Sequence, residues 1–220
     1  MPDFTLYTVP GSPFARAALA TLEEKGAAYR VAAVAPGELK TEPHMSRHPF
    51  GRVPVLQHGD FWLYETQAIL RYLDRVLPSP PLTPQDPKAA ARMDQAMNVS
   101  DWYLFQGVGN VIAFQRVVAP MLFGLAPDEA AIEAAMPRAH VVFAGLSRLL
   151  GDEDYFAGSF SLADLTLAPQ IDFFVGIPEW APLMGPHSNL RAWHERAISR
   201  ASLQATTWNR VSEKAQAAAK

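Results

Sequence analysis

The chain has 220 residues, of which 49% are hydrophobic and 19% are charged, and its formal net charge is −3. This composition argues against disorder, and the lack of a basic excess makes nucleic acid and anionic membranes poor candidate partners. No apolar run is long enough to span a bilayer and no signal peptide is visible, so a cytoplasmic protein is expected. Cysteine is absent, so any thiol chemistry must use a thiol supplied by a ligand.

Strand and helix patterns alternate through the first 77 residues. Strands are expected where apolar residues alternate, and helices where apolar residues recur with helical spacing. In chain order the patterns predict a strand at 4–8, a helix at 13–25, a strand at 29–34, a hairpin of 53–57 with 61–64, and a helix at 67–76. This order is typical of a thioredoxin-like α/β domain, which we assign to residues 1–77.

A proline-rich stretch then divides the chain. Five of the ten residues from 78 to 87 are proline, which is not tolerated inside a helix or a central strand, so this stretch is predicted to be a stiff linker. Beyond it the patterns are helical, and residues 88–220 are assigned to an all-helical domain. Helices are predicted at 88–118, 127–150, 161–175 and 189–199, and the Ala-rich end of the chain is expected to fray.

The most informative motif spans His48-Pro49-Phe50-Gly51-Arg52-Val53-Pro54-Val55-Leu56 and Phe61-Trp62-Leu63-Tyr64-Glu65-Thr66. A loop ends in a Val-Pro step, two short strands follow, and the second delivers a carboxylate and a hydroxyl to a helix start. With the strand, Ser-Pro helix and strand that precede it, this layout resembles the glutathione-binding domain of glutathione transferases. The resemblance implies the glutathione transferase fold, in which a thioredoxin-like domain precedes an all-helical domain with an electrophile pocket.

Ser12 carries the sharpest chemical hypothesis. It precedes Pro13, and serine followed by proline is a favoured helix opening, so one interpretation is a structural N-cap. A hydroxyl at a helix N-terminus can also stabilise a bound thiolate. Serine-type glutathione transferases use such a serine to hold the glutathione sulfur, so the resemblance implies that Ser12 is catalytic. Other branches of the family use a tyrosine at the end of the first strand, but for Tyr7 we prefer a packing role.

Four further residues are candidates for contact with the rest of glutathione. Pro54 either simply starts a strand or follows a cis bond that turns the Val53 backbone outward, as the family does to hold the cysteinyl unit. Glu65 and Thr66 are either helix caps or, by the resemblance, partners of the ammonium and carboxylate of the γ-glutamyl group.

The glycyl carboxylate of glutathione needs a cation. The segment 37–40 resembles the plant-type, or phi-class, segment that carries a His-Lys pair; Lys40 matches its lysine and Leu39 replaces the histidine. Arg52 stands where that class has glutamine and can bind a carboxylate with two hydrogen bonds. The alternative for both Lys40 and Arg52 is ordinary solvated surface.

The electrophile pocket is expected to involve Phe14, which follows the Ser-Pro step, and residues of the helical domain. Residues 101–120 resemble the phi-class helix that walls this pocket, which makes Tyr103, Phe114 and Val118 candidates, although an apolar stripe of this kind is often core. The run Ser161-Leu162-Ala163-Asp164 is a variant capping box, for which a folding role is expected and not a catalytic one.

No other cofactor is indicated. His44 and His48 are four apart but lie in a loop segment, so a metal site is not expected, and neither Gly-x-Gly-x-x-Gly nor a P-loop is present. Glutathione is therefore expected as co-substrate and no bound cofactor is expected.

The sequence thus predicts a homodimeric, serine-type glutathione transferase near the phi class, with a detoxification role. It would conjugate glutathione to small hydrophobic electrophiles, with glutathione-dependent peroxidase activity as a further option. The alternative is a non-catalytic protein of the same fold that binds glutathione or apolar ligands. Phe50, in the polar loop of the main motif, is predicted to anchor the dimer, the alternative being that it folds back onto its own domain.

Overall fold

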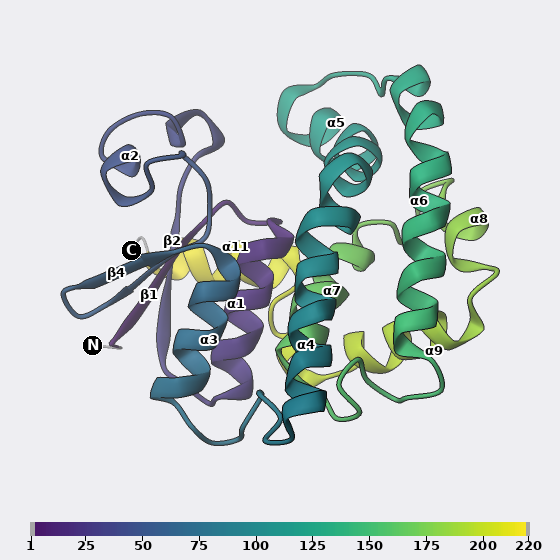
Figure 1. Ribbon diagram of the computed structural model, residues 1–220. Coiled ribbons are helices and arrows are strands. Elements are labelled where there is room, and N and C mark those ends of the chain that lie inside the picture. The colour runs from purple at the N-terminus through teal and green to yellow at the C-terminus, as the bar shows by residue number, and fades with distance from the viewer. Residues whose placement is uncertain (1–2, 219–220) are drawn as a thin grey trace. The chain divides into compact units, whose positions relative to one another are not determined.

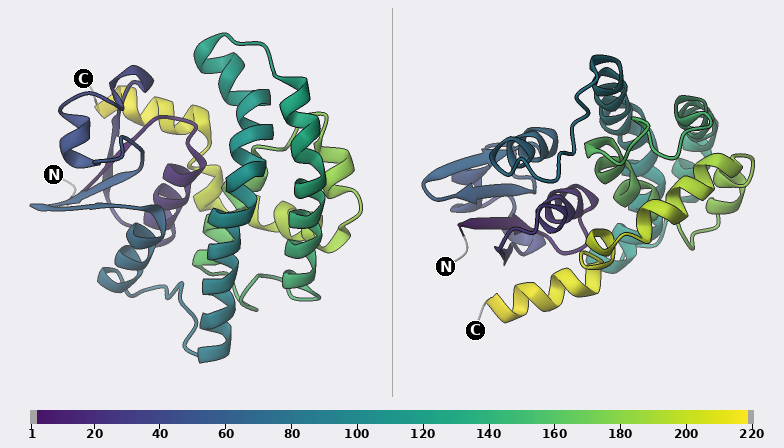
Figure 2. Two further views of the ribbon diagram at one scale, coloured as in Figure 1. Left: turned by 45° about the horizontal axis from the view of Figure 1, so that its top comes forward. Right: turned by 90° about the horizontal axis from the view of Figure 1, so that it is seen from below.

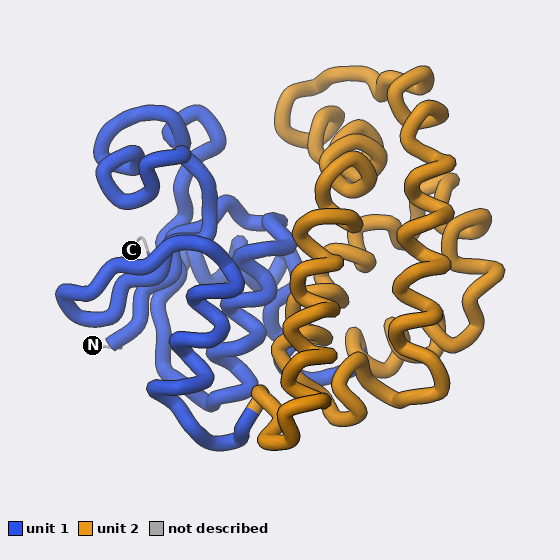
Figure 3. Tube along the Cα trace, in the orientation of Figure 1, with its two compact units in different colours: residues 1–81, 199–220 blue, residues 82–198 orange. Residues whose placement is uncertain are grey.

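The computed structural model describes residues 3–218 and divides into two compact units (Figure 3). Unit 1 comprises the chain up to Pro81 together with the segment that begins at Ser199, and unit 2 comprises Leu82–Ile198. The division falls within the predicted proline-rich linker. Among the described residues no helix has the length and apolar character needed to cross a membrane.

Within residues 3–218, unit 1 contains a four-stranded mixed sheet with the strand order β2-β1-β3-β4 (Figure 1). β1 pairs in parallel with β2, and antiparallel with β3, which in turn pairs antiparallel with β4. This arrangement confirms the predicted thioredoxin-like domain. The strands are β1 (Phe4–Thr8), β2 (Tyr29–Ala33), β3 (Val55–His58) and β4 (Phe61–Tyr64).

The core of unit 1 follows from the register of the sheet. Leu6 of β1 pairs with Leu56 of β3, and both side chains are fully buried. Helices α1 (Pro13–Glu24) and α3 (Thr66–Val76) lie side by side and bury their apolar faces in the same core (Figure 1). Two short elements that the sequence did not predict, η1 (Pro36–Glu38) and α2 (His44–Arg47), lie between β2 and β3.

The C-terminal segment differs from the sequence-based assignment, which placed it in the helical domain. Helices α10 (Ala201–Gln204) and α11 (Trp208–Ala218) belong to unit 1, and α11 packs along β2, where Figure 2 shows it in yellow. Ion pairs as well as apolar contacts hold this segment on unit 1. Arg200 binds both carboxylate oxygens of Glu24, each at 2.8 Å, and Lys214 Nζ lies 2.5 Å from Glu23 Oε1.

The expectation that the Ala-rich end frays is wrong as far as Ala218, where α11 ends. Val211 and Ala215 are buried on one face of this helix, so packing against unit 1 supplies the stabilisation that a short isolated helix lacks. The last two residues lie outside the described part of the chain.

Unit 2 is helical, as predicted. Its elements are α4 (Pro87–Val99), η2 (Ser100–Val118), α5 (Ala119–Phe123), α6 (Glu129–Leu150), the central α7 (Leu162–Asp172), α8 (Trp180–Met184) and α9 (Ser188–Ile198). The central helix α7 is almost completely buried and contacts α4, η2 and α9.

The predicted continuous helix over 88–118 is interrupted. Gln106 has ψ 113° and Gly107 has φ 80°, so the backbone leaves the helical conformation there. The side chain of Asn110 stabilises this break, because its Oδ1 accepts a hydrogen bond of 2.6 Å from Gly107 N. A side chain that binds a nearby backbone N–H in this way competes with the helix.

Candidate functional site

Ser12 lies at the junction of a tight turn and α1. Its backbone N–H donates to the carbonyl of Val9 at 3.1 Å, and Gly11 between them has φ 95°, which a turn of this kind requires. Ser12 is the N-cap of α1, with Pro13 as the first helical residue, and its Oγ accepts from Ala15 N at 3.3 Å. In that bond the oxygen acts as acceptor, so the hydroxyl proton is available for donation. Capping and donation to a bound sulfur are therefore compatible roles.

Tyr7 is engaged differently. Its hydroxyl donates to Gln57 Oε1 at 3.2 Å, and its ring centroid lies 5.5 Å from that of Trp62. The guanidinium carbon of Arg47 lies 4.6 Å from the Tyr7 ring centroid, a cation–π distance. These contacts fit the packing role that we prefer for Tyr7. The Arg47 contact could not be predicted from the sequence, because α2 was not predicted.

The Val53–Pro54 peptide bond is cis, which is one of the two alternatives that the sequence left open. Val53 is half-buried and Pro54 is buried, directly before β3.

Glu65 has φ 72° and ψ 117°, and among residues 3–218 it is the one non-glycine residue with a positive φ. Glu65 occupies the N-cap position of α3 and its carbonyl accepts from Ile69 N at 3.0 Å, but its side chain makes no capping hydrogen bond to the helix. Such a backbone conformation costs about 1–3 kcal/mol and is typical of functional positions. Thr66 is buried as the first residue of α3. The strained backbone therefore presents an exposed carboxylate beside a helix N-terminus.

Lys40 and Arg52 come together in one loop cluster of unit 1. Lys40 Nζ donates to the carbonyl oxygen of Phe50 at 2.6 Å, and Arg52 is exposed two residues further along. Gly51, with φ 56°, makes this approach possible, since a Cβ there would lie 2.5 Å from the carbonyl oxygen of Leu39 and 2.7 Å from Lys40 Cδ. Because Lys40 already donates to the carbonyl oxygen of Phe50, Arg52 is the better placed of the two cations to bind a ligand carboxylate.

Phe50 does not fold back into the core. Its side chain is 60% exposed, with its ring edge-on to Tyr64 at a centroid distance of 6.3 Å. The neighbouring His48 is buried, and its Nδ1 accepts from Phe50 N at 3.4 Å. Burial lowers the pKa of His48 below its usual value. The buried His48 therefore supports a loop whose aromatic residue faces solvent in the single chain.

The pocket candidates divide between the two units. Phe14 is half-buried in α1 of unit 1, whereas Tyr103, Phe114 and Val118 lie on η2 of unit 2. Tyr103 is 56% exposed and Phe114 36%, so these two aromatic side chains are not core residues. Phe123 of α5, which the sequence analysis missed, lies with its ring centroid 6.3 Å from that of Phe114.

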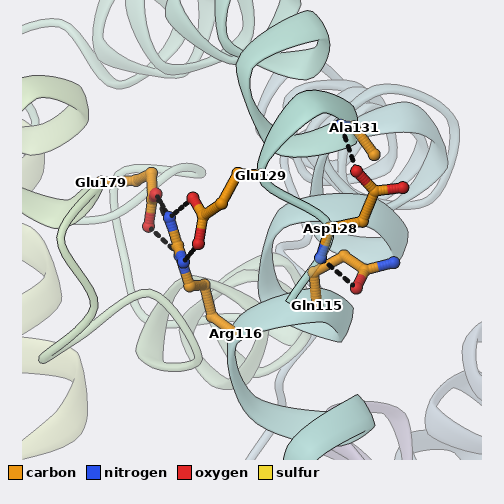
Figure 4. Close-up of polar contacts among 6 residues, drawn as sticks. All are labelled: Gln115, Arg116, Asp128, Glu129, Ala131 and Glu179. Atoms are coloured by element: carbon orange, nitrogen blue, oxygen red, sulfur yellow. Dashed lines mark hydrogen bonds and ion pairs between the residues drawn. The ribbon is translucent and has the colours of Figure 1, made fainter. Parts of the chain in front are cut away.

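Arg116, between Phe114 and Val118, forms a charged cluster that the sequence did not reveal (Figure 4). Its guanidinium binds both oxygens of Glu129 at 2.6 and 2.8 Å and both oxygens of Glu179 at 2.7–3.2 Å. These bonds raise the pKa of Arg116 and lower that of Glu129. The cluster joins the end of η2 to the first residue of α6 and to the residue before α8.

In residues 3–218, no group of three or more His, Asp or Glu side chains is positioned to hold a metal ion.

Comparison with known proteins identifies the family. Residues 2–75 match the glutathione S-transferase N-terminal domain, and residues 129–196 match the glutathione S-transferase C-terminal domain. The chain belongs to the glutathione S-transferase family. This membership also confirms the expected enzyme class, a glutathione transferase.

Relatives of this glutathione transferase include plant proteins of the phi class. Probable glutathione S-transferase GSTF2 of Oryza sativa subsp. japonica is 33% identical over 190 residues, which cover 84% of this chain and 87% of the rice protein. Glutathione transferase F7 from Populus trichocarpa has a similar structure, with a TM-score of 0.84 and 27% identity, covering 96% and 99% of the two chains. A glutathione S-transferase-I structure bound with lactoylglutathione matches with a TM-score of 0.81 and 28% identity, covering 98% and 99%.

Proposed function

We propose that this glutathione transferase conjugates the thiol of glutathione to small hydrophobic electrophiles, with Ser12 stabilising the sulfur as thiolate. The observation that supports this proposal is the hydrogen bonding of the Ser12 hydroxyl. Its oxygen caps α1 by accepting from Ala15 N, while its proton is free to be donated. A thiol has a pKa of about 8.5, and a donor at a helix N-terminus lowers that value by favouring the anion.

For this reaction the protein supplies mainly activation of the thiol and positioning of the two reactants. The thiol proton leaves to solvent as glutathione binds, and the thiolate keeps a hydrogen bond from Ser12 Oγ. The sulfur then donates its electron pair to an electrophilic carbon, a C–S bond forms, and the leaving group departs with the electrons of the bond that breaks. The hydroxyl of Ser12 is not consumed, so it is ready for the next turnover.

The rest of glutathione is proposed to bind along unit 1. The exposed carboxylate of Glu65 attracts the γ-glutamyl ammonium, and Thr66 with the N-terminal N–H groups of α3 receives the adjacent carboxylate. The backbone of Val53, followed by Pro54, pairs with the cysteinyl unit. The glycyl carboxylate is taken up by cations of the Lys40 and Arg52 cluster, with Arg52 the freer of the two.

For the electrophile we retain Phe14 in unit 1 and Tyr103, Phe114 and Val118 in unit 2 as candidate contacts. Exposed aromatic side chains on η2 favour apolar ligands over charged ones. Turnover of a generic aryl halide is the expected activity. Reduction of a hydroperoxide by glutathione is the second assay, and binding of glutathione without either turnover would favour a non-catalytic ligand-binding protein.

The working form is proposed to be a cytoplasmic homodimer with a role in detoxification. Support comes from Phe50, whose 60% exposure in the single chain leaves a large apolar surface next to the glutathione-binding loop. Burial of this ring in the partner of a symmetric dimer would remove that surface from water twice, once for each copy.

The proposal is tested by comparing Ser12→Ala with Tyr7→Phe. The thiolate absorbance of bound glutathione is titrated with pH, and conjugation of an aryl halide is measured in parallel. Loss of one charge-assisted hydrogen bond, worth about 1.5–3 kcal/mol, should raise the pKa of the bound thiol by about one to two units in the Ser12 variant while glutathione still binds. Tyr7→Phe should change it little. The opposite pattern would mean that Tyr7 holds the sulfur.

A further inference from the structure

We infer that Trp208 is a positioning residue for Ser12: its indole ring packs against Gly11 and holds the turn that aims the Ser12 hydroxyl. The inference rests on the catalytic role proposed for Ser12. It concerns the first residue of α11, far from Ser12 in sequence but in the same unit.

The contact between Trp208 and Gly11 is close and flat. A Cβ built on Gly11 would lie 2.6 Å from Cδ2 and Cε3 of Trp208 and 2.7 Å from Cε2. Near-equal distances to three atoms of the six-membered ring mean that the face of the indole, and not its edge, covers this glycine. No side chain other than hydrogen fits at position 11 while the indole is there.

The turn beneath the indole determines the geometry of the Ser12 side chain. Gly11 has φ 95°, and Ser12 follows with φ −64° and ψ 120°, closed by its hydrogen bond to Val9. Rotation of the Gly11 backbone would redirect the Ser12 Cα–Cβ bond. Glycine itself resists such rotation less than any other residue, so packing adds a restraint to the hydrogen bond between Ser12 and Val9. The Trp208 ring, packed against Gly11, supplies this restraint.

Trp208 is itself firmly held, because α11 is tied to unit 1 at several points. Lys214 Nζ lies 2.5 Å from Glu23 Oε1 and 2.5 Å from the hydroxyl of Tyr29, and Val211 is buried. Before α11, Arg16 of α1 donates to the carbonyl of Leu203 at 3.1 Å. The indole is therefore attached to the same helix, α1, that Ser12 caps.

A positioning role makes a specific kinetic prediction. If the indole is removed, Ser12 still has its hydroxyl, but the hydroxyl points at the sulfur for a smaller fraction of the time. The pKa of bound glutathione should rise and the turnover number should fall, whereas contacts to the two ends of glutathione are unchanged. The Michaelis constant for glutathione should therefore change less than the turnover number.

The experiment compares Trp208→Leu, Trp208→Phe and Val211→Ala with the wild-type protein and with Ser12→Ala. Val211→Ala is the matched control, because it truncates a buried residue of α11 that is not among the atoms nearest a Cβ on Gly11. For each protein we would measure thermal unfolding, the thiolate absorbance of bound glutathione against pH, and the kinetics of aryl halide conjugation.

We expect Trp208→Leu to raise the pKa of bound glutathione by about half a unit or more, with a turnover number about threefold lower at a pH below that pKa. Trp208→Phe, which keeps a flat ring, should recover most of the wild-type pKa. Val211→Ala should lower the unfolding temperature without moving the pKa.

Three results would overturn the inference, and they are distinguishable. If Ser12→Ala shifts the pKa of bound glutathione and Trp208→Leu does not, Trp208 has no positioning role and the role of Ser12 stands. If Ser12→Ala leaves the pKa unchanged, the proposed function of Ser12 fails, and the inference about Trp208 fails with it. A pKa shift in Val211→Ala equal to that in Trp208→Leu would also contradict a specific role for the indole.

Discussion

Trp193 donates its indole N–H to Asp164 Oδ1 at 2.8 Å, and both side chains are completely buried in unit 2. The same carboxylate accepts from Phe156 N at 3.2 Å, from Ser161 N at 2.9 Å and from Ser161 Oγ at 3.1 Å. The capping box predicted at this position is therefore confirmed. Asp164 organises the start of the central helix, an arrangement that fits the folding role expected from the sequence.

Asp164→Asn should destabilise unit 2. The amide places two donors where four donors now converge on two carboxylate oxygens, so at least one buried N–H loses its acceptor. The expected loss in free energy of unfolding is about 2–3 kcal/mol near neutral pH. Denaturant unfolding of the variant beside the wild type measures it. An unchanged midpoint would mean that the carboxylate is dispensable for the helix start.

The difference in free energy of unfolding between the wild type and Asp164→Asn should also depend on pH. Burial raises the pKa of Asp164 to about 6, above the unfolded value of 3.8, so between these values the folded state binds more proton than the unfolded state. The resulting stabilisation is fully present below the unfolded value and is lost as the pH rises through the folded one. The free energy of unfolding of the wild type should therefore fall by about 1 kcal/mol relative to that of Asp164→Asn between about pH 5 and about pH 7. A constant difference would show that the carboxyl group does not titrate in this range.

Arg116→Ala should destabilise unit 2 more than Arg116→Lys. Glu179 is buried, and removal of the guanidinium leaves its charge without a partner, at a cost of about 3–5 kcal/mol. Lysine restores the charge but cannot bind two carboxylates with paired hydrogen bonds. Unfolding midpoints measure the order of stability of these variants. Glu129→Gln is the control for the exposed partner, and only a small loss of stability is expected for it. Equal stability of the alanine and lysine variants would contradict the prediction.

Comparison of Glu65→Ala with Glu65→Gly should separate the role of the carboxylate in glutathione binding from the effect of backbone strain on stability. Both variants lose the carboxylate, so titration calorimetry should give weaker glutathione binding, and the Michaelis constant should rise more than the turnover number falls. Glycine in addition accepts the φ of 72°, so Glu65→Gly should fold with stability at or above that of the wild type. Wild-type glutathione affinity in both variants would exclude Glu65 from the site.

Phe50→Ala should weaken the proposed dimer. A buried aromatic anchor contributes about 2 kcal/mol or more to an interface, and a two-fold axis makes one substitution remove two anchors. Sedimentation should shift toward monomer at low micromolar concentration, and glutathione binding should weaken because Arg52 and Val53 share the loop. Phe61→Ala, which removes a 45% exposed ring elsewhere in unit 1, is the control. A Phe50 variant that stays dimeric on dilution, with wild-type activity, would disprove the anchor.

The parts of the fold that the sequence predicted are those with strong local patterns. The alternation around Leu6 and Leu56 predicts β1 and β3 because their burial follows from the period of a strand. The break in η2 has a local signal as well, in Gly107 and Asn110, which the apolar periodicity outweighed. A conflict between periodicity and turn residues is where such predictions fail.

The missed features depend on contacts between distant residues. Nothing near Trp208 indicates that it covers Gly11, and the link between Lys214 and Glu23 joins residues 191 positions apart. The positive φ of Glu65, which lies between β4 and α3, has no local sequence signal either. The sequence therefore located Ser12 and its loop, whereas the residues that support them appear only in the folded chain.

A crystal structure with glutathione bound would show which residue activates the thiol. If Ser12 does so, the nearest hydrogen-bond donor to the glutathione sulfur is Ser12 Oγ, within about 3.5 Å, and Tyr7 remains bonded to Gln57. A sulfur that instead accepts its hydrogen bond from the Tyr7 hydroxyl, with Ser12 serving only as the cap of α1, would disprove the role of Ser12.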